Sequence, residues 1–254
     1  AVEIARLSPS FMSVTYGAGG GTSQYTADLA ACLAKKYGVT SMAHLTCVSS
    51  TREHVRGVVE RLRENGIENI LALRGDLPSD GHVEKDYSHA SDLAAELAAM
   101  EDFCIGGACY PEGHPESKNK AEDIRYLKEK VDAGCSFLTT QMFFDNDLFY
   151  NFLYRIREAG ISVPVVAGIM PVTNAKQMKR ILSMSGTVLP TRFKMLLDRF
   201  GDDPAAMKQA GIAYATDQII DLFANGINHV HVYSMNKPEV AAAIMNNLSA
   251  IVKY

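Results

Sequence analysis

Apolar runs of strand length alternate with longer amphipathic segments along the chain. Seven such runs are centred near residues 14, 45, 72, 106, 140, 166 and 231. The segments between them have helical periodicity, with a unit repeating about every 30 residues. In residues 51–66, for example, Gly66 is placed to end a helix whose four apolar side chains share one face: Val55, Val58, Val59 and Leu62. The pattern predicts strands and helices in alternation.

Strands rich in Val, Ile, Leu and Ala that alternate with helices indicate an α/β fold with a parallel sheet covered on both faces. A doubly wound sheet gathers its chemistry at one switch point, whereas a (β/α)8 barrel gathers it from all its strand ends. Polar residues stand at the carboxyl ends of nearly all the predicted strands: Thr15, His44, Asp76, Tyr110, Gln141 and Tyr233. We therefore expect a (β/α)8 TIM barrel, with residues 1–254 as a single catalytic domain.

A barrel of this kind needs eight strands, but only seven runs are found, preceded by a short helical fragment at residues 1–8. We expect the first strand to lie upstream of Ala1, outside this sequence. Two connections are also too long for simple turns. Residues 77–90 are expected to form a functional loop, and residues 170–229 to hold about three helices that cap one side of the barrel mouth.

Composition narrows the class of ligand. The chain has 25 basic and 29 acidic residues, with neither sign gathered into a run. This argues against nucleic acid or an anionic membrane as the main partner, so we expect small molecules. The five cysteines form no Cys-x-x-Cys pair, as suits reduced thiols, and no apolar stretch approaches the roughly 20 residues of a membrane span. These features predict a cytoplasmic protein.

The stretch ILALRGDLP, residues 70–78, reads as a buried strand that ends in opposite charges. Charge at the end of a buried strand costs desolvation unless it is paired or used. Arg74 and Asp76 are therefore either a structural ion pair or part of a site. Taken alone, the ion pair is the simpler interpretation.

Two other stretches suggest ligand sites only weakly. Residues 16–22, YGAGGGT, lack the third glycine of a dinucleotide fingerprint and predict a tight strand-to-helix turn. His229, His231 and Tyr233 share one strand face, which can ligate a metal in some barrels. Few further ligands stand at the other strand ends, so hydrogen-bonded core histidines are the favoured interpretation and we expect no metal.

The segment 110–134 predicts a loop and then a helix that buries Ile124, Leu127 and Val131. Asp123 and Lys130 lie seven residues apart, on one side of this helix and about 10 Å apart along its axis. One extended ligand can touch both, although ordinary surface charges would look the same.

Gln141 interrupts the apolar and aromatic run TTQMFFD, residues 139–145. Its amide can donate and accept hydrogen bonds at once, which suits a heterocycle that bears an amide. A satisfied core glutamine is the alternative.

Together, eight segments in order resemble the methylenetetrahydrofolate reductases, a family of flavin-dependent (β/α)8 enzymes. They are SVTYGAGG, AHLTC, LALRGDLP, YPEGHPES, KVDAG, TTQMFFD, GIMPVTNAKQ and HVYSMN. The resemblance extends from about Pro9 to Ala250. It implies reduction of 5,10-methylenetetrahydrofolate to 5-methyltetrahydrofolate by ping-pong chemistry, in which NADH or NADPH reduces FAD and leaves before the folate takes its place.

The resemblance also implies roles for particular residues. Its expected FAD contacts are Thr15, His44, Arg74, Gly75, Asp76, Ala90, Tyr110, His114, Asp123 and Lys130. Asp76 and Gln141 are expected to be catalytic, Asp76 by stabilising the cationic form of the folate and Gln141 by hydrogen bonding the pterin. The expected substrate-binding residues are Asp76, Gln141, Gln177, Ile181, Tyr233 and Lys237. A homo-oligomer or an assembly with partner subunits is also expected.

The sequence departs from the family at several places, among them Tyr126 and Glu129, to which no role is assigned, and two departures concern expected site residues. The family carries a glutamate, near an E-F-x-P-P segment on its first strand, as general acid; this segment is absent, and Glu3 is no candidate for it. Lys237 stands where relatives often carry arginine, so a two-pronged grip on the glutamate tail of the folate becomes a point charge. The missing glutamate leaves open a catalytically silent flavin- or folate-binding subunit, and His229 and His231 leave open a metal-dependent barrel hydrolase.

Overall fold

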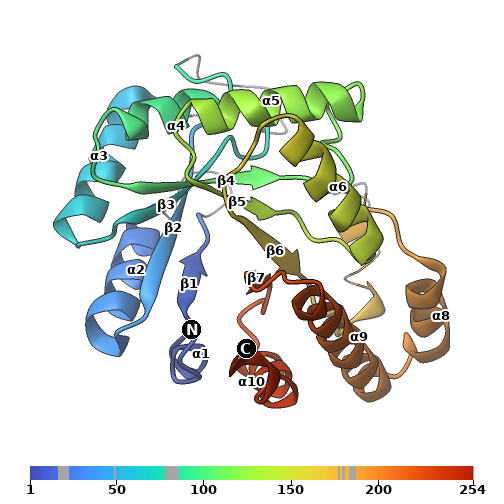
Figure 1. The fold of residues 1–254 in the computed structure, drawn as a ribbon. Helices are drawn as coiled ribbons and strands as arrows, with labels where there is room; N and C mark the ends of the chain where they lie inside the picture. The colour runs from blue at the N-terminus through green and yellow to red at the C-terminus, as the bar shows by residue number, and fades with distance from the viewer. Residues whose placement is uncertain are drawn as a thin grey trace. The chain divides into compact units, whose positions relative to one another are not determined.

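A computed structural model describes residues 1–16, 23–48, 50–77, 86–176, 178, 181–182 and 187–253. Strands and helices alternate along it (Figure 1). All seven runs that the sequence predicts are strands: β1 (Phe11–Val14), β2 (Thr40–Thr46), β3 (Asn69–Leu73), β4 (Cys104–Cys109), β5 (Phe137–Thr140), β6 (Val165–Ile169) and β7 (Val230–Val232).

The helices fall between the strands, as the periodicity predicts. They are α1 (Val2–Ala5), α2 (Ser23–Tyr37), α3 (Arg52–Glu64), α4 (Ala90–Ala98), α5 (Lys120–Asp132), α6 (Asn146–Glu158), α8 (Thr191–Phe200), α9 (Pro204–Ala224) and α10 (Pro238–Asn247), followed by a 3-10 turn, η1 (Ile251–Lys253). In the described part of the long connection 170–229, helical residues at 175–176, 178 and 181–182 precede α8 and α9. The glycine-rich turn at 17–22 and most of the predicted loop, residues 78–85, lie outside the described residues.

The strands follow one another in the order β1-β2-β3-β4-β5-β6-β7. The pairs whose register is defined are parallel, for example β2 with β3, where His44 faces Leu71 and Thr46 faces Leu73. Parallel strands in sequence order, each followed by a helix, are the pattern of the (β/α)8 barrel. The fold class is therefore the one that the sequence predicts. α1 is the element before β1, and an eighth strand upstream of Ala1 stays a prediction.

The chain divides into two compact units. Unit 1 comprises Ala1–Ala108 and Tyr126–Leu138, and unit 2 comprises Cys109–Arg125 and Thr139–Tyr254. In unit 1, α3 begins at Thr51, whose side chain accepts a hydrogen bond from the His54 backbone, and ends before Gly66 at φ +72°. Its buried face consists of the four predicted residues, and it adds to a core built around β2, β3 and α4.

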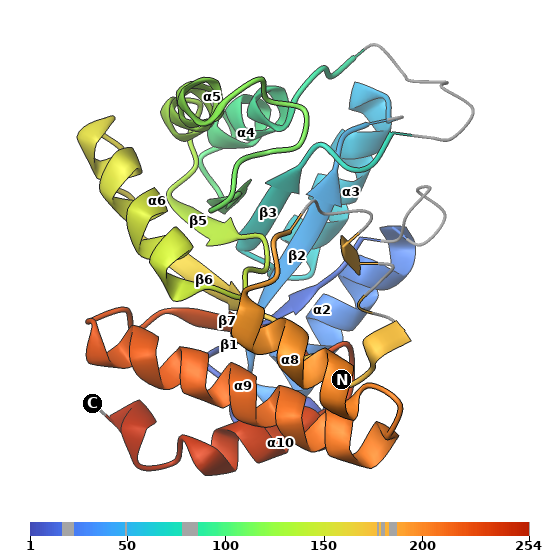
Figure 2. The same ribbon diagram turned by 90° about the vertical axis from the view of Figure 1, so that its right-hand side faces the viewer.

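In unit 2, α8, α9 and α10 run side by side (Figure 2). Aromatic and methionine side chains fill the core that α8 and α9 share with the segments after β5 and β6. Gly211 allows α9 to pack this closely, because a Cβ there would lie 1.8 Å from the Val172 carbonyl oxygen. No helix of the described residues combines the length and the apolar character needed to cross a bilayer.

The helix at 120–132 differs from its prediction in one respect. Leu127 is buried, but Ile124 and Val131 are only half-buried. The apolar face of α5 is therefore covered mainly at its middle turn, whereas periodicity alone predicted a face buried along its length.

Candidate functional site

In unit 1, the parallel register of β1 to β4 brings predicted site residues to one edge of the sheet. Thr15 directly follows β1 and is exposed, and its carbonyl oxygen accepts a hydrogen bond from Thr26 Oγ1 at 3.1 Å. His44 lies near the end of β2 and is half-buried. Arg74 follows the last residue of β3. Because carboxyl ends of parallel strands meet at one edge, these side chains belong to one surface of the unit.

The Arg-Gly-Asp turn after β3 is held from the neighbouring strand. The Arg74 carbonyl oxygen accepts hydrogen bonds from the backbone N–H groups of Cys47 at 3.2 Å and Val48 at 2.7 Å. Gly75 has φ +91°, and a Cβ on it would lie 2.8 Å from Val48 Cγ1 and 3.0 Å from Thr46 Cβ. Only glycine fits this turn without strain.

The structure corrects the premise of a buried charge pair at this turn. The strand stops at Leu73, and Asp76 is exposed, while Arg74 is half-buried and donates from Nε to the Gly75 carbonyl oxygen at 3.3 Å. The Asp76 carboxylate therefore has a small desolvation cost and does not need an ion pair with Arg74 to offset it. It is left able to act on a ligand.

The ammonium group of Lys130 lies at the end of β4. Its Nζ donates to the Ala108 carbonyl oxygen on β4 at 2.7 Å. The stem of the side chain passes Gly107, where a Cβ would lie 2.8 Å from Lys130 Cδ. A glycine in β4 is thus needed for the ammonium group to reach this edge of unit 1.

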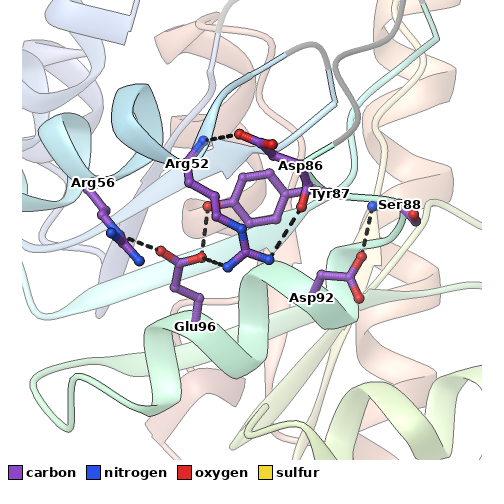
Figure 3. A network of polar contacts seen from close by, with 7 residues as sticks. All are labelled: Arg52, Arg56, Asp86, Tyr87, Ser88, Asp92 and Glu96. Atoms are coloured by element: carbon purple, nitrogen blue, oxygen red, sulfur yellow. Dashed lines mark hydrogen bonds and ion pairs between the residues drawn. The ribbon is translucent and has the colours of Figure 1, made fainter.

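A network of charges fastens α4 to α3 (Figure 3). Glu96, whose side chain is only 10% exposed, accepts hydrogen bonds at 2.9 Å from both Arg52 and Arg56. It also accepts one from the Tyr87 hydroxyl at 3.0 Å. Burial, and next the bond to Glu96, raise the pKa of Tyr87, so this hydroxyl stays protonated as a donor.

The same network positions the segment that leads into α4 (Figure 3). The Asp86 carboxylate accepts from the Arg52 backbone N–H at 2.9 Å, and Asp92 accepts from the backbone N–H groups of Ser88 and His89 at 2.7 and 2.9 Å. The first helical residue after this segment is Ala90, which is buried. The position of Ala90 is therefore set by the bond of Asp86 to α3 before it and by the bonds of Asp92 in α4 after it.

In unit 2, the loop after β4 and the first turn of α5 carry three of the predicted cofactor residues. The Tyr110 and His114 rings meet edge to face with centroids 4.6 Å apart. His114 Nδ1 accepts from the Glu116 backbone N–H at 3.1 Å, and Asp123 accepts from the Ser117 hydroxyl at 3.1 Å. Tyr110 and Asp123 also line one hollow beside α5 and α6, together with Lys120 and Arg155.

Gln141 follows β5 beside this loop, because its backbone N–H donates to the Cys109 carbonyl oxygen at 2.7 Å. Its side-chain Oε1 accepts from the Met142 backbone N–H at 3.0 Å. One lone pair of Oε1 is therefore used within the loop, while the second lone pair can still accept and Nε2 remains to donate. An amide that donates to and accepts from a ligand at once stays a prediction.

Tyr233, His231 in β7 and His229 just before β7 differ in burial and in contacts. The Tyr233 hydroxyl donates to the Thr140 carbonyl oxygen at 2.7 Å, and burial raises its pKa. His231 packs edge-on against Tyr233 at 4.8 Å, and burial lowers its pKa to about 4, whereas His229 is exposed. No three metal-ligating side chains come together anywhere in the described ranges.

A second hollow in unit 2 brings two predicted substrate residues together. Lys237 Nζ donates to Thr173 Oγ1 at 2.7 Å. The hollow is lined by Ile181 and Lys237 with Met170, Pro171, Val172, Thr173, Asn174, Met178, Ser234, Met235 and Val240. Gln177, which the sequence also places with this group, lies outside the described residues. The described lining combines apolar side chains with the polar residues Thr173, Asn174 and Ser234 and the cation of Lys237.

Comparison with known proteins decides the family. Residues 2–249 match the family model described as methylenetetrahydrofolate reductase. The chain belongs to this family. It is 37% identical, over 97% of its length and 82% of theirs, to the 5,10-methylenetetrahydrofolate reductases of Pectobacterium carotovorum subsp. carotovorum and Escherichia coli (strain K12).

The fold comparison agrees with this assignment. An uncharacterized protein from Clostridium thermocellum that binds two copies of 5-methyl-5,6,7,8-tetrahydrofolic acid superimposes with a TM-score of 0.56 at 13% identity, covering 96% of this chain and 95% of that one. At this identity the likeness shows the fold alone. As a methylenetetrahydrofolate reductase, the chain is an oxidoreductase that reduces 5,10-methylenetetrahydrofolate to 5-methyltetrahydrofolate. This removes the hydrolase alternative.

Glu112 is a residue of this reductase that pattern reasoning missed. Its Oε2 accepts from the Val188 backbone N–H at 2.7 Å, which ties the loop after β4 to the segment before α8. Burial raises the pKa of its carboxyl, and Oε1 has no partner among the described residues. The available signal was its place between Tyr110 and His114, in the segment that carries the resemblance.

Proposed function

We propose that this reductase works with FAD and with NADH or NADPH, binding the nicotinamide and the folate in turn. When bound, FAD supplies hydride transfer between these two substrates. The observation that carries the proposal concerns the strand ends of unit 1. The ammonium group of Lys130 lies at the end of β4, and the Arg-Gly-Asp turn follows β3. A nearby cation stabilises the anionic form of a reduced flavin ring, and the flat ring must also lie close to the protein backbone. Lys130 supports the first requirement, and the glycine of the Arg-Gly-Asp turn supports the second.

The proposed FAD contacts are the ones expected from the resemblance: Thr15, His44, Arg74, Gly75, Asp76, Ala90, Tyr110, His114, Asp123 and Lys130. Lys130 would raise the reduction potential of the flavin, and Asp76 would lower it. At about 4 Å and an effective dielectric near 20, each such effect reaches about 4 kcal/mol before compensation. The balance between the two residues would therefore tune the cofactor.

Asp76 has a second proposed role, toward the folate. Opening the five-membered ring of the substrate produces a cation, which an exposed carboxylate next to the site would stabilise. Gln141 would donate from Nε2 to an acceptor on the pterin, or to the carboxamide oxygen of the nicotinamide. Gln177, Ile181, Tyr233 and Lys237 are proposed to complete the substrate site, with Lys237 as a point charge for the glutamate tail.

The proposal treats residues 1–254 as one catalytic (β/α)8 domain acting on small molecules in the cytoplasm, as a homo-oligomer or with partner subunits. Support for a reducing compartment comes from the cysteines, since all five are free thiols. Burial raises the pKa of Cys47 and of Cys135 to about 11, so both stay protonated and unreactive.

The test begins with the colour of the purified protein. It should be yellow, NADH or NADPH should bleach it without oxygen, and 5,10-methylenetetrahydrofolate should then restore the colour. A colourless protein that reduces the folate would contradict the proposed cofactor. A yellow protein that neither nucleotide bleaches would point to the silent subunit.

A further inference from the structure

The loop that follows β5, residues 141–145, and Asn146, with which α6 begins, are fastened by side chains of α9. The Tyr214 hydroxyl donates to the Phe144 carbonyl oxygen at 2.5 Å. Gln218 Nε2 donates to the Phe143 carbonyl oxygen at 3.3 Å. Tyr214 and Gln218 are both buried, at 8% and 6% exposed, so neither bond competes with water. Two consecutive carbonyl groups of the loop thus depend on one helix.

The end of the loop is tied to the same helix. Asn146 Nδ2 donates to the Gln218 carbonyl oxygen at 3.0 Å and to Asp221 Oδ2 at 2.6 Å. In return, Gln218 Nε2 donates to Asn146 Oδ1 at 3.3 Å. Gln218 therefore uses its side-chain donors on the middle and on the end of the loop.

Stacked rings limit the directions in which the loop can shift. Phe143 stacks on Phe149 with centroids 5.0 Å apart, and Phe144 stacks on Phe193 at 4.7 Å. Phe193 in turn contacts the Tyr214 ring at 4.7 Å. The hydrogen bonds from α9 therefore act on a loop that is already packed on both sides, and they select one of its few possible positions.

We propose that Tyr214 and Gln218 are positioning residues for Gln141 in the folate reaction. This rests on the proposed role of Gln141 as the donor to the substrate. Because Oε1 of Gln141 is tied to the Met142 backbone, the direction of Nε2 follows the backbone of the loop. A shift of the loop by about 1 Å would move this donor out of hydrogen-bond range, an effect that can cost up to a hundredfold in rate.

The composition of α9 supports the inference. A glutamine that is 6% exposed loses its contacts with water, and its Oε1 has no partner among the described residues. An apolar side chain would avoid this cost and pack equally well. The presence of a glutamine at this buried position is explained if the loop needs the two hydrogen-bond donors of Gln218.

The experiment compares three variants of the FAD-loaded protein. Tyr214→Phe removes only a hydroxyl, and Gln218→Met removes both donors at similar length. Thr216→Val is the matched control, since Thr216 is a buried residue of the same helix whose hydroxyl donates to the Ile212 carbonyl oxygen at 2.8 Å and accepts from Asn247 Nδ2 at 3.4 Å, with neither bond to the loop. Equilibrium binding of 5-methyltetrahydrofolate and kcat/KM for 5,10-methylenetetrahydrofolate should each fall about tenfold in the first two variants and stay within twofold in the control.

A double-mutant cycle with Gln141→Leu separates positioning from general stability. In that background, neither Tyr214→Phe nor Gln218→Met should weaken folate binding further, because the donor that they position is gone. Full additivity, or an equal loss in Thr216→Val, would overturn the positioning role and leave the proposed function intact. An unchanged Gln141→Leu protein would overturn the role of Gln141 itself, and positioning with it. If Gln218→Met fails to fold, Tyr214→Phe carries the same comparison alone.

Discussion

Asp76 is the exposed last residue of the Arg-Gly-Asp turn, so its charge can be removed without opening a cavity. Asp76→Asn should fold and retain FAD. Loss of a negative charge should raise the potential of the bound flavin, so reduction by the nicotinamide should change little. Hydride transfer to the folate should slow by one to a few powers of ten, because the donor is weaker and the cation lacks its counter-charge.

Anaerobic stopped-flow measurement of the two half-reactions checks this asymmetry in the Asp76→Asn protein. Equal slowing of both half-reactions would remove the folate role of the carboxylate. Thermal unfolding of the same variant serves as the control and should match the wild type.

The prediction for Gln141 concerns its Nε2 hydrogen-bond donor. Gln141→Glu keeps an acceptor for the Met142 backbone but replaces the Nε2 donor with a charged oxygen. Turnover of the folate should fall by one to a few powers of ten, because an acceptor on the substrate then faces a carboxylate. Steady-state kinetics with a flavin absorbance spectrum checks both parts. Unchanged folate kinetics would exclude Gln141 from the site.

Gly75 is required by the geometry of its turn. Gly75→Ala should destabilise the protein by about 2–3 kcal/mol, since a Cβ meets Val48 and Thr46 and the residue has φ +91°. Gly66→Ala is the matched control, because Gly66 also has positive φ but open space around it, and it should cost only about 1 kcal/mol. Urea unfolding of both variants measures the difference. Equal losses would contradict the steric argument.

At the scale of elements, the contact between α3 and α4 depends on Glu96. Glu96→Gln removes the charge that Arg52 and Arg56 share and should cost about 1–2 kcal/mol, because this carboxylate is only 10% exposed. The flavin should also bind more weakly, since the segment before Ala90 is held through Tyr87.

The control for Glu96→Gln is Glu60→Gln on α3. Glu60 pairs with Arg63 at 2.7 Å, but the two side chains are 54% and 41% exposed. Its loss should cost no more than about 0.5 kcal/mol and leave flavin affinity unchanged. Flavin titration and urea unfolding test both variants, and equal effects would show that the network of Glu96 has no special role.

For the whole molecule, burial of His231 makes stability depend on pH. Burial lowers its pKa to about 4, while an unfolded histidine titrates near 6.5. Between these values the unfolded chain binds the extra proton, so the contribution is complete above about pH 6.5 and is lost as the pH falls to about 4. The loss amounts to at most about 3 kcal/mol.

Urea unfolding at several pH values between 7 and 4 checks this dependence. His231→Asn should unfold with a smaller decrease in stability across the range than the wild type. His229→Asn, at an exposed position beside the same strand, should keep the wild-type decrease. An unchanged decrease in His231→Asn would show that another group causes the acid sensitivity.

Much of the architecture follows from local patterns. The strands and α3 were predictable because side-chain periodicity reports which face a segment buries, and Gly66 ends its helix through its own backbone freedom. The polar residues at strand ends were predictable as a group for a similar reason, since parallel strands bring all their carboxyl ends to one edge. The family, too, was evident from short motifs in order.

The sequence by itself therefore determined the fold class, the family and the candidate residues of this reductase. Only the tertiary structure decided the contacts and the exposure of those residues. It committed one oxygen of Gln141 to the Met142 backbone, brought Lys130 to the Ala108 carbonyl oxygen, and left Asp76 exposed. Tyr214 contacts Phe144 across 70 residues of sequence. A partner as distant in sequence as Phe144 is from Tyr214 is chosen by packing between segments, which the local periodicity of a chain does not report.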